Sequence, residues 1–306
     1  MKKCFCVLLF VPLYIFSQQQ SSDKFLFSSR MHLAGNIIRT SFKTIPSDFA
    51  YMGKNVTEDW KKTALYTGII GALMVVDKPV TMFYQDEIET RVDYKLPDIS
   101  IYNNDFPWTS GNDAYLFYAM SGTYLGSLFT GYERGQYAAI NGFKALGYSI
   151  LISHTILKTI FGRKRPYSNL SGDNSNASNE ATDNPFDFFN SREGEYIFSG
   201  PHGTAMPSLH ATAFFAMAKV FQMEFDNYWI PYSFAGIVFF ADIKGHKHWV
   251  SDMVAGGIVG TIIGRSIVRS SWRARGILPN KEKEITFNCI PSISSQYSGF
   301  RLTATF

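Results

Sequence analysis

The sequence predicts an all-α fold, a helical bundle of about six core helices followed by a short C-terminal β-hairpin. Long apolar segments alternate with short polar stretches from residue 59 onward, and each segment is longer than ten residues. Small residues recur within the segments at three- and four-residue spacing, which is the period of a helix face. The strict apolar and polar alternation of strands is confined to the last part of the chain.

The first 18 residues are expected to form a signal peptide. Two lysines precede an apolar run over residues 4–16, and polar residues follow where cleavage would occur. The run is shorter than the ~20 residues that a membrane-spanning helix needs, which favours an export signal over an uncleaved anchor. Removal of the signal would leave Cys289 as the only cysteine, so no internal disulfide could form.

Residues 19–60 are expected to form an N-terminal arm with room for one short helix, because Pro46 and Gly53 interrupt a weak pattern. The helical domain is expected over residues 61–272. Its six helices are predicted at residues 61–77, 113–132, 136–161, 205–225, 229–241 and 250–270.

The composition indicates a folded protein with an apolar surface. Hydrophobic residues make up 46% of the chain, aromatic residues 16% and charged residues 18%, which excludes a disordered chain. Of the six predicted helices, only the one at residues 113–132 contains 19 consecutive residues without a charge, at 114–132. Most helices are therefore expected to be core helices of an exported, periplasmic or envelope-associated protein. An integral membrane protein is the alternative. The net charge of +4 is mild and scattered, which excludes nucleic acid as a partner and allows a small anionic ligand or a membrane surface.

Three patterns predict how the second half of the chain is organised. The polar residues between 167 and 195 predict a solvated loop that borders the site described below. Gly256, Gly260 and Gly264 lie on one helix face, where another helix could approach closely. The tail, residues 273–306, is expected to contain a β-hairpin because two runs alternate in it, with apolar residues at Ile285, Phe287 and Cys289 and then at Phe300, Leu302, Ala304 and Phe306.

The first candidate motif contains Lys158, Arg165 and Pro166 at the end of a predicted helix. Seven residues make about two helical turns, so the two cations could point the same way while Pro166 stops the helix. The structural alternative is a basic last turn that complements the helix dipole.

The second motif contains Ser208, Leu209 and His210, at the start of an apolar helix. Ser208 occupies the place of an N-cap, and the backbone N–H groups that follow could bind an anion beside His210. The alternative is an ordinary serine-capped helix with a solvent-facing histidine.

The third motif contains His248 and Asp252. Four-residue spacing would place both on one helical face, where the carboxylate could hold one ring nitrogen protonated and leave the other as a nucleophile. A buried structural pair is one alternative. A metal site that also includes His246 is another, which the absence of a second cluster with metal-ligand spacing disfavours.

Taken in order, the three motifs resemble those of the type 2 phosphatidic acid phosphatase superfamily, which also includes bacterial class A acid phosphatases and vanadium haloperoxidases. The resemblance covers residues 135–270. It implies a helical bundle in which the motifs converge at one end, and an active site with no cofactor and no catalytic divalent metal.

The resemblance also implies a role for each matching residue. Lys158 and Arg165 would bind the phosphate oxygens, and Ser208 and the backbone near Leu209 would add hydrogen-bond donors. These four would neutralise the charge of the transferred group, as phosphoryl transfer requires.

The same resemblance assigns the catalytic residues. His248 would attack phosphorus, Asp252 would orient His248, and His210 would protonate the leaving oxygen. The substrate would be a phosphorylated small molecule or a lipid phosphate, and the sequence leaves the oligomeric state open.

Two positions depart from the family pattern. Leu209 stands where glycine is usual, and Asp242 stands six residues before His248, where the pattern has a phosphate-binding arginine. The second departure predicts a lowered catalytic efficiency and gives two alternatives to a phosphatase. These are a weakened family member that acts as an envelope binding or scaffold protein and, less favoured, a vanadate-dependent haloperoxidase.

Overall fold

The computed structural model confirms the all-α fold with a small β element. It describes residues 20–92, 94–99, 108, 111–174, 179–190, 203–241, 243, 247–277, 286–293 and 298–305, with side chains from residue 28 to residue 277. The predicted signal peptide, Asp242 and His246 lie outside the described residues.

Two helices form before residue 60, where the sequence left room for one short helix. They are α1 (Gln20–Lys43) and α2 (Ile45–Thr57). Pro46 does not interrupt them because it lies in the first turn of α2, where proline has no intrahelical hydrogen bond to lose. Met52 packs against Ile263 and Ile267 of the last helix, so tertiary contacts supply the stability that the weak pattern does not indicate.

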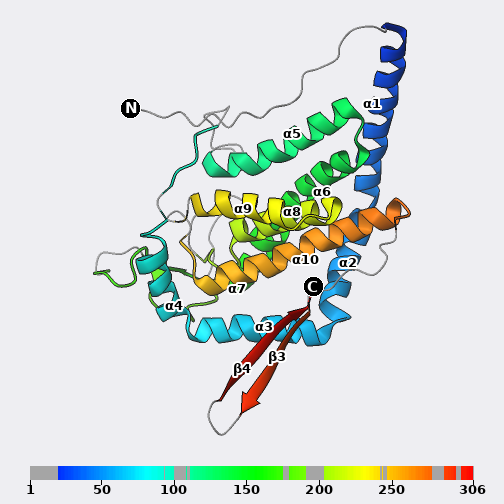
Figure 1. The fold of residues 1–306 in the computed structure, drawn as a ribbon. Helices are drawn as coiled ribbons and strands as arrows, with labels where there is room; N and C mark the ends of the chain where they lie inside the picture. Colours follow the sequence, from blue (N-terminus) through cyan, green and yellow to red (C-terminus); the bar gives the residue numbers. More distant parts are fainter. Residues whose placement is uncertain are drawn as a thin grey trace.

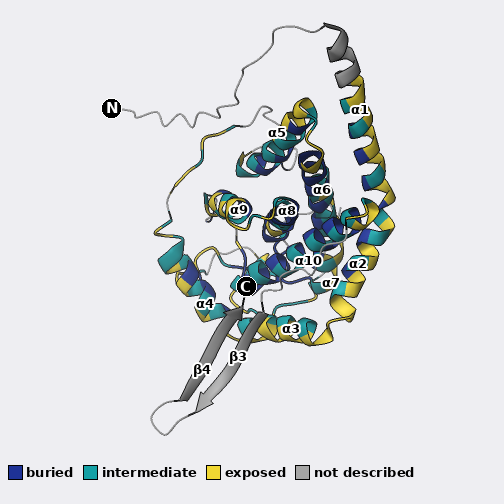
Figure 2. Ribbon diagram, turned by 45° about the vertical axis from the view of Figure 1, so that its right-hand side comes forward, coloured by how far each residue is buried: buried dark blue, intermediate teal, exposed yellow. Residues whose placement is uncertain are grey.

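The central helix of the bundle is α8 (Leu209–Phe225), with buried residues around most of its circumference (Figures 1 and 2). It packs against α6, α9 and α10, and α5 packs on α6. The bounds of these neighbours are Ala114–Thr130 for α5, Glu133–Ser149 for α6, Trp229–Ala241 for α9 and Val250–Ala274 for α10. Each of the six predicted segments therefore contains a helix.

The glycine face of α10 packs directly on α8, as its spacing predicted. A Cβ atom added to Gly256 would lie 2.6 Å from the carbonyl oxygen of Ser208, and one at Gly260 or Gly264 would clash with carbonyl groups farther along α8. Only glycine permits this approach. The contact brings the N-termini of α8 and α10 together.

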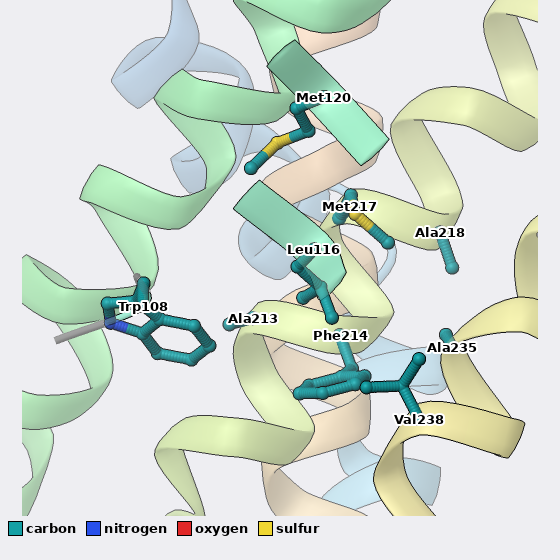
Figure 3. Close-up of a cluster of buried hydrophobic side chains, with 9 residues drawn as sticks. All are labelled: Trp108, Leu116, Met120, Ala213, Phe214, Met217, Ala218, Ala235 and Val238. Atoms are coloured by element: carbon teal, nitrogen blue, oxygen red, sulfur yellow. The ribbon is translucent and has the colours of Figure 1, made fainter. Parts of the chain in front are cut away.

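One hydrophobic cluster connects α5, α8 and α9 (Figure 3). The side chains of Phe214 and Met217 lie at its centre and meet Leu116 of α5 and Val238 of α9. Trp108, 6% exposed, closes the cluster beside the N-terminus of α8.

Two further helices follow α2, and both contact α10. The segment α3 (Trp60–Val75) is followed by α4 (Asp77–Phe83) and a π-helical turn η1 (Tyr84–Ile88). Helix α6 continues through the π-helical segment η3 (Ile150–Leu157) into α7 (Lys158–Phe161). Neither α4 nor η1 was predicted as a separate element.

Two small sheets complete the described fold. Strand β1 (Arg165–Pro166) pairs in parallel with β2 (Ala181–Thr182), so part of the predicted solvated loop returns to the first motif. Strands β3 (Thr286–Ile293) and β4 (Ser298–Thr305) pair antiparallel, with Cys289 opposite Leu302, which confirms the predicted hairpin.

Among the described residues, α10 is long and apolar enough to cross a membrane, and more than half of its apolar stretch is buried inside the protein. A second span would be counted if α3 and the helical segment after it were one span, but these meet at a bend of 74°. Length and composition do not separate such helices from the core helices of a soluble bundle.

Candidate active site

The chain leaves α7 at Gly162, four residues before Pro166. Gly162 has φ +52°, a left-handed conformation that ends the helix, and a Cβ at this position would lie 2.7 Å from the carbonyl oxygen of Asn190. The expectation that Pro166 stops the helix was therefore wrong. The turn at Gly162 directs Arg163 into the protein interior.

Arg163 is fully buried between two carboxylates. Its Nη1 donates to Asp252 Oδ1 at 2.6 Å, and its Nη2 donates to Asp77 Oδ2 at 2.7 Å. Nε and Nη2 also donate to the carbonyl oxygen of Pro185, at 2.9 and 2.7 Å. The guanidinium lies over the rings of Phe188 and Trp249. Several partners thus compensate for the burial of this charge.

Asp252 is the third residue of α10 and caps the helix that contains it. Its Oδ2 accepts the backbone N–H of Trp249 at 3.0 Å. Burial raises the pKa of Asp252 to about 6; the charge of Arg163 opposes this shift, and the charge of Asp77 adds to it. The carboxylate therefore becomes protonated about two pH units above an ordinary aspartate.

His248 lies before α10, because the helix begins at Val250 with Trp249 as its N-cap. The expectation that His248 and Asp252 share one helical face was wrong, and the cap brings them together instead. His248 Nδ1 lies 3.8 Å from Asp252 Oδ2, which is longer than a hydrogen bond.

Ser208 is the N-cap of α8, as predicted, and its hydroxyl accepts the N–H of Ala211 at 3.5 Å. The predicted helix start at residue 205 was therefore too early. The backbone N–H of Ser208 donates to the carbonyl oxygen of Asp252 at 3.0 Å, which joins the second motif to the third. Leu209 begins α8 directly after this contact.

The two cations of the first motif lie on the segments around α7. Lys158 is 2% exposed. Five residues earlier, the hydroxyl of Ser153 donates to the carbonyl oxygen of Pro207 at 3.4 Å, which connects this segment with the residue before Ser208. Arg165 Nε donates to Thr204 Oγ1 at 3.2 Å. Burial lowers the pKa of Arg165, and the charge of Asp252 opposes this shift, so Arg165 lies within electrostatic reach of Asp252.

His210 lies in the first turn of α8 and is partly exposed. Its Nε2 lies 3.1 Å from Asp113 Oδ2, and its ring lies 5.5 Å from that of Trp108, measured between ring centroids. The histidine is therefore oriented by residues that precede α5. Of the predicted site residues, Ser208, His248 and Asp252 form one contact group, and His210 faces Asp113.

Sequence reasoning missed several residues that the structure brings to this end of the bundle. Asp77 and Asp113 are isolated acids in the first 120 residues, and no spacing connects them with the motifs. Arg163 lies between Lys158 and Arg165 in the first motif, but the motif assigned it no role. Its place beside Gly162 was the available signal, because a glycine cap redirects the chain there.

The fold and site thus define a mainly helical protein in which a buried arginine, two histidines and a helix-capping aspartate lie near the N-termini of α8 and α10. Residues 141–275 match the family model described as the PAP2 superfamily. No curated protein and no solved structure matches the chain with significance.

The matched region contains all three motifs, and the match supports the resemblance of this region to the type 2 phosphatidic acid phosphatase superfamily. Members of this superfamily are generally phosphatases, and they are often membrane-associated or exported. Asp77 and Asp113 lie outside the matched region.

Proposed function

We propose that this protein is a metal-independent phosphatase that hydrolyses phosphate monoesters or lipid-linked (pyro)phosphates through a phosphohistidine on His248. The observation that carries the proposal is the contact group of Ser208, His248 and Asp252, where the N-terminus of α8 meets the residues that precede α10. A histidine beside a carboxylate and a helix N-terminus has the parts that nucleophilic phosphoryl transfer needs.

In the first step, His248 Nε2 attacks phosphorus, because Nδ1 lies toward Asp252. A nitrogen–phosphorus bond forms and the bond from phosphorus to the leaving oxygen breaks, while His210 donates a proton to that oxygen. Asp252 holds the imidazole as its positive charge develops. Lys158, Arg165 and the first N–H groups of α8 stabilise the phosphoryl oxygens.

In the second step, water attacks the phosphohistidine. The nitrogen–phosphorus bond breaks, inorganic phosphate leaves and the water proton passes to His210. Asp113 orients His210 in both steps, since it lies 3.1 Å from Nε2.

A lipid phosphate is the substrate class that a neighbouring cleft favours. The cleft has a volume of about 780 Å³ and lies between α2, α3, α8, α9 and α10. Ala211 and Val250, which line it, are three and two residues from Ser208 and His248. Phe214, Phe239, Met253 and Ile258 supply apolar walls, which suit a hydrocarbon chain attached to a phosphate in the site.

The surface supports a location at the cell envelope. Large apolar side chains of α3, α5 and α9 are exposed, among them Trp60, Phe129, Trp229 and Ile230. Apolar groups exposed on several helices favour contact with a lipid surface. We therefore propose an exported protein that associates with a membrane surface.

The test is hydrolysis and trapping with the purified mature chain. The protein is incubated with ³²P-labelled phosphatidic acid, a lipid pyrophosphate or an aryl phosphate, and then quenched in alkali, where a phosphohistidine persists. We expect labelled protein with the wild type and none with His248→Ala. Turnover without labelled protein would contradict the phosphohistidine, whereas absence of turnover in the wild type would favour the scaffold alternative. Halide oxidation with added vanadate would favour the haloperoxidase.

A further inference from the structure

We propose that Asp77 is a positioning residue for this reaction, which acts through Arg163 and the first turn of α10 to hold Asp252 and His248 in place. The inference rests on the proposed function. It adds a residue from α4, a helix outside the region that matches the family, to the machinery of the site.

The first support is the hydrogen bonding of the N-terminus of α10. The first N–H groups of a helix have no partner within it. Asp77 Oδ1 accepts the N–H of Ser251 at 3.0 Å, and Thr81 Oγ1 accepts the N–H of Val250 at 3.2 Å. Both acceptors belong to α4 and are fully buried. Helix α4 therefore fixes where α10 begins, and His248 lies two residues before that point.

The second support is the shared arginine. Asp77 and Asp252 both accept hydrogen bonds from Arg163, at 2.7 and 2.6 Å, and all three side chains are fully buried. Ser251 Oγ accepts from Arg163 Nη1 at 2.7 Å and also contacts Asp77 Oδ2. One guanidinium thus serves two carboxylates, and neither can move without changing the contact of the other.

The sharing also sets the charge that Asp252 presents to His248. Arg163 and Arg165 face Asp252 from the segment after α7, Asp77 faces it from α4, and His248 faces it from the residues before α10. The charge of Asp77 raises the pKa of Asp252, and that of Arg163 lowers it. Without Asp77 the Arg163 guanidinium would interact with the Asp252 carboxylate only. The charge of Asp252 would then be more fully neutralised, and it would stabilise the positive charge that develops on His248 less.

The main variant is Asp77→Asn, which preserves the shape of the side chain and removes its charge. We expect kcat to fall about 10- to 100-fold, the loss typical of one charge-assisted hydrogen bond, with KM within about twofold of the wild type. The acidic limb of the pH profile of kcat should move to lower pH, because a charge that raises the pKa of Asp252 is gone.

The control is Asp48→Asn, which removes another fully buried carboxylate far from the site. Asp48 pairs with Lys144 at 2.5 Å and accepts from the hydroxyl of Tyr148 at 2.9 Å, beside the C-terminal half of α10. Its loss should lower the midpoint of thermal unfolding and leave the pH profile of kcat unchanged. If Asp77→Asn behaves in the same way, the role of Asp77 is structural and the inference is wrong.

A second variant tests the inference if Asp77→Asn does not fold. Ser251→Ala removes the hydroxyl between Arg163 and Asp77 without burying an unpaired charge. We expect kcat to fall about 2- to 10-fold with an unchanged pH profile, since an uncharged hydrogen bond is lost. A wild-type kcat in Ser251→Ala would overturn the inference.

The proposed function and this inference fail in different ways. Absence of an alkali-stable phosphoenzyme in the wild-type protein would overturn both. If the wild type forms the phosphoenzyme and Asp77→Asn forms it at the same rate, only the role of Asp77 would be overturned.

Discussion

The backbone N–H of Ser208 donates to the carbonyl oxygen of Asp252 at 3.0 Å, and this bond joins the N-termini of α8 and α10. The contact is made by main-chain atoms and is protected by Gly256, whose missing side chain leaves room for the Ser208 carbonyl group. The position of the N-terminus of α8 relative to His248 therefore depends on helix packing as much as on the motif side chains.

Gly256→Ala should lower both stability and activity. The added Cβ would lie 2.6 Å from the Ser208 carbonyl oxygen, so the helices must separate, at a cost of about 1–3 kcal/mol in the free energy of unfolding. Gly257→Ala is the matched control, because its Cβ would meet Phe215 at an ordinary 3.5 Å. That variant should be neutral or up to about 1 kcal/mol more stable in urea unfolding. Equal effects of the two substitutions would contradict the packing argument.

His248→Ala should abolish turnover, whereas the effect of His210→Ala should depend on the leaving group. A nucleophile is needed for every substrate, but a leaving-group acid matters less when the leaving oxygen is already a weak base. The ratio of kcat for nitrophenyl phosphate to kcat for an alkyl phosphate should therefore rise in His210→Ala. A ratio equal to that of the wild type would remove His210 from the role of acid.

The pH dependences of activity and stability should have opposite signs where Asp252 titrates. Its pKa is raised to about 6, so kcat should fall as the pH falls through that value and the carboxylate is lost. A raised folded-state pKa makes the contribution of Asp252 to stability largest below its unfolded value and smaller as the pH rises through about 6. The free energy of unfolding of the wild type minus that of Asp252→Asn, measured in urea, should be larger at pH 5 than at pH 7. A larger difference at pH 7 would contradict the raised pKa.

Activity should survive EDTA and be inhibited by vanadate. Lys158, Arg165 and backbone N–H groups would neutralise the phosphate, and vanadate would occupy the same place as a phosphate mimic. Turnover of an aryl phosphate should be measured before and after dialysis against chelator. Loss of activity with rescue by zinc would instead support a metal site that includes His246 and His248.

The mature protein should leave membranes in carbonate or high salt, or appear in a periplasmic extract. Helix α10 passes the length test for a membrane span, but more than half of its apolar stretch is buried in the bundle. Fractionation followed by detection of the C-terminal tail would decide the question. Retention until detergent is added would make the protein integral.

Local patterns predicted the elements that are stabilised locally. Apolar periodicity was sufficient for α8, α9 and α10, a serine before an apolar run was sufficient for the cap of α8, and the glycine spacing was sufficient for the close contact of α10. These features depend on residues within one or two turns, so the sequence shows them directly. The first helices were missed because their stability comes from packing on α10.

The site could be predicted only where its residues belong to motifs. The position of His248 was misjudged because Asp252 caps α10. The helix therefore begins at Val250, after the histidine. Asp77 was missed because its partners lie more than 80 residues away, and a single acid in a short helix carries no local signal. Long-range ion pairs of this kind become visible only in three dimensions.

The sharing of Arg163 also sets the smallest piece of the chain that can work. A fragment limited to residues 141–275 would keep all three motifs, yet it would bury the guanidinium with one of its two carboxylates absent. Such a fragment would also lack the acceptors that α4 gives to the start of α10. If the protein has the proposed activity, a fragment cut at the limits of its recognisable motifs should therefore be inactive, and a transplantable unit must begin before Asp77.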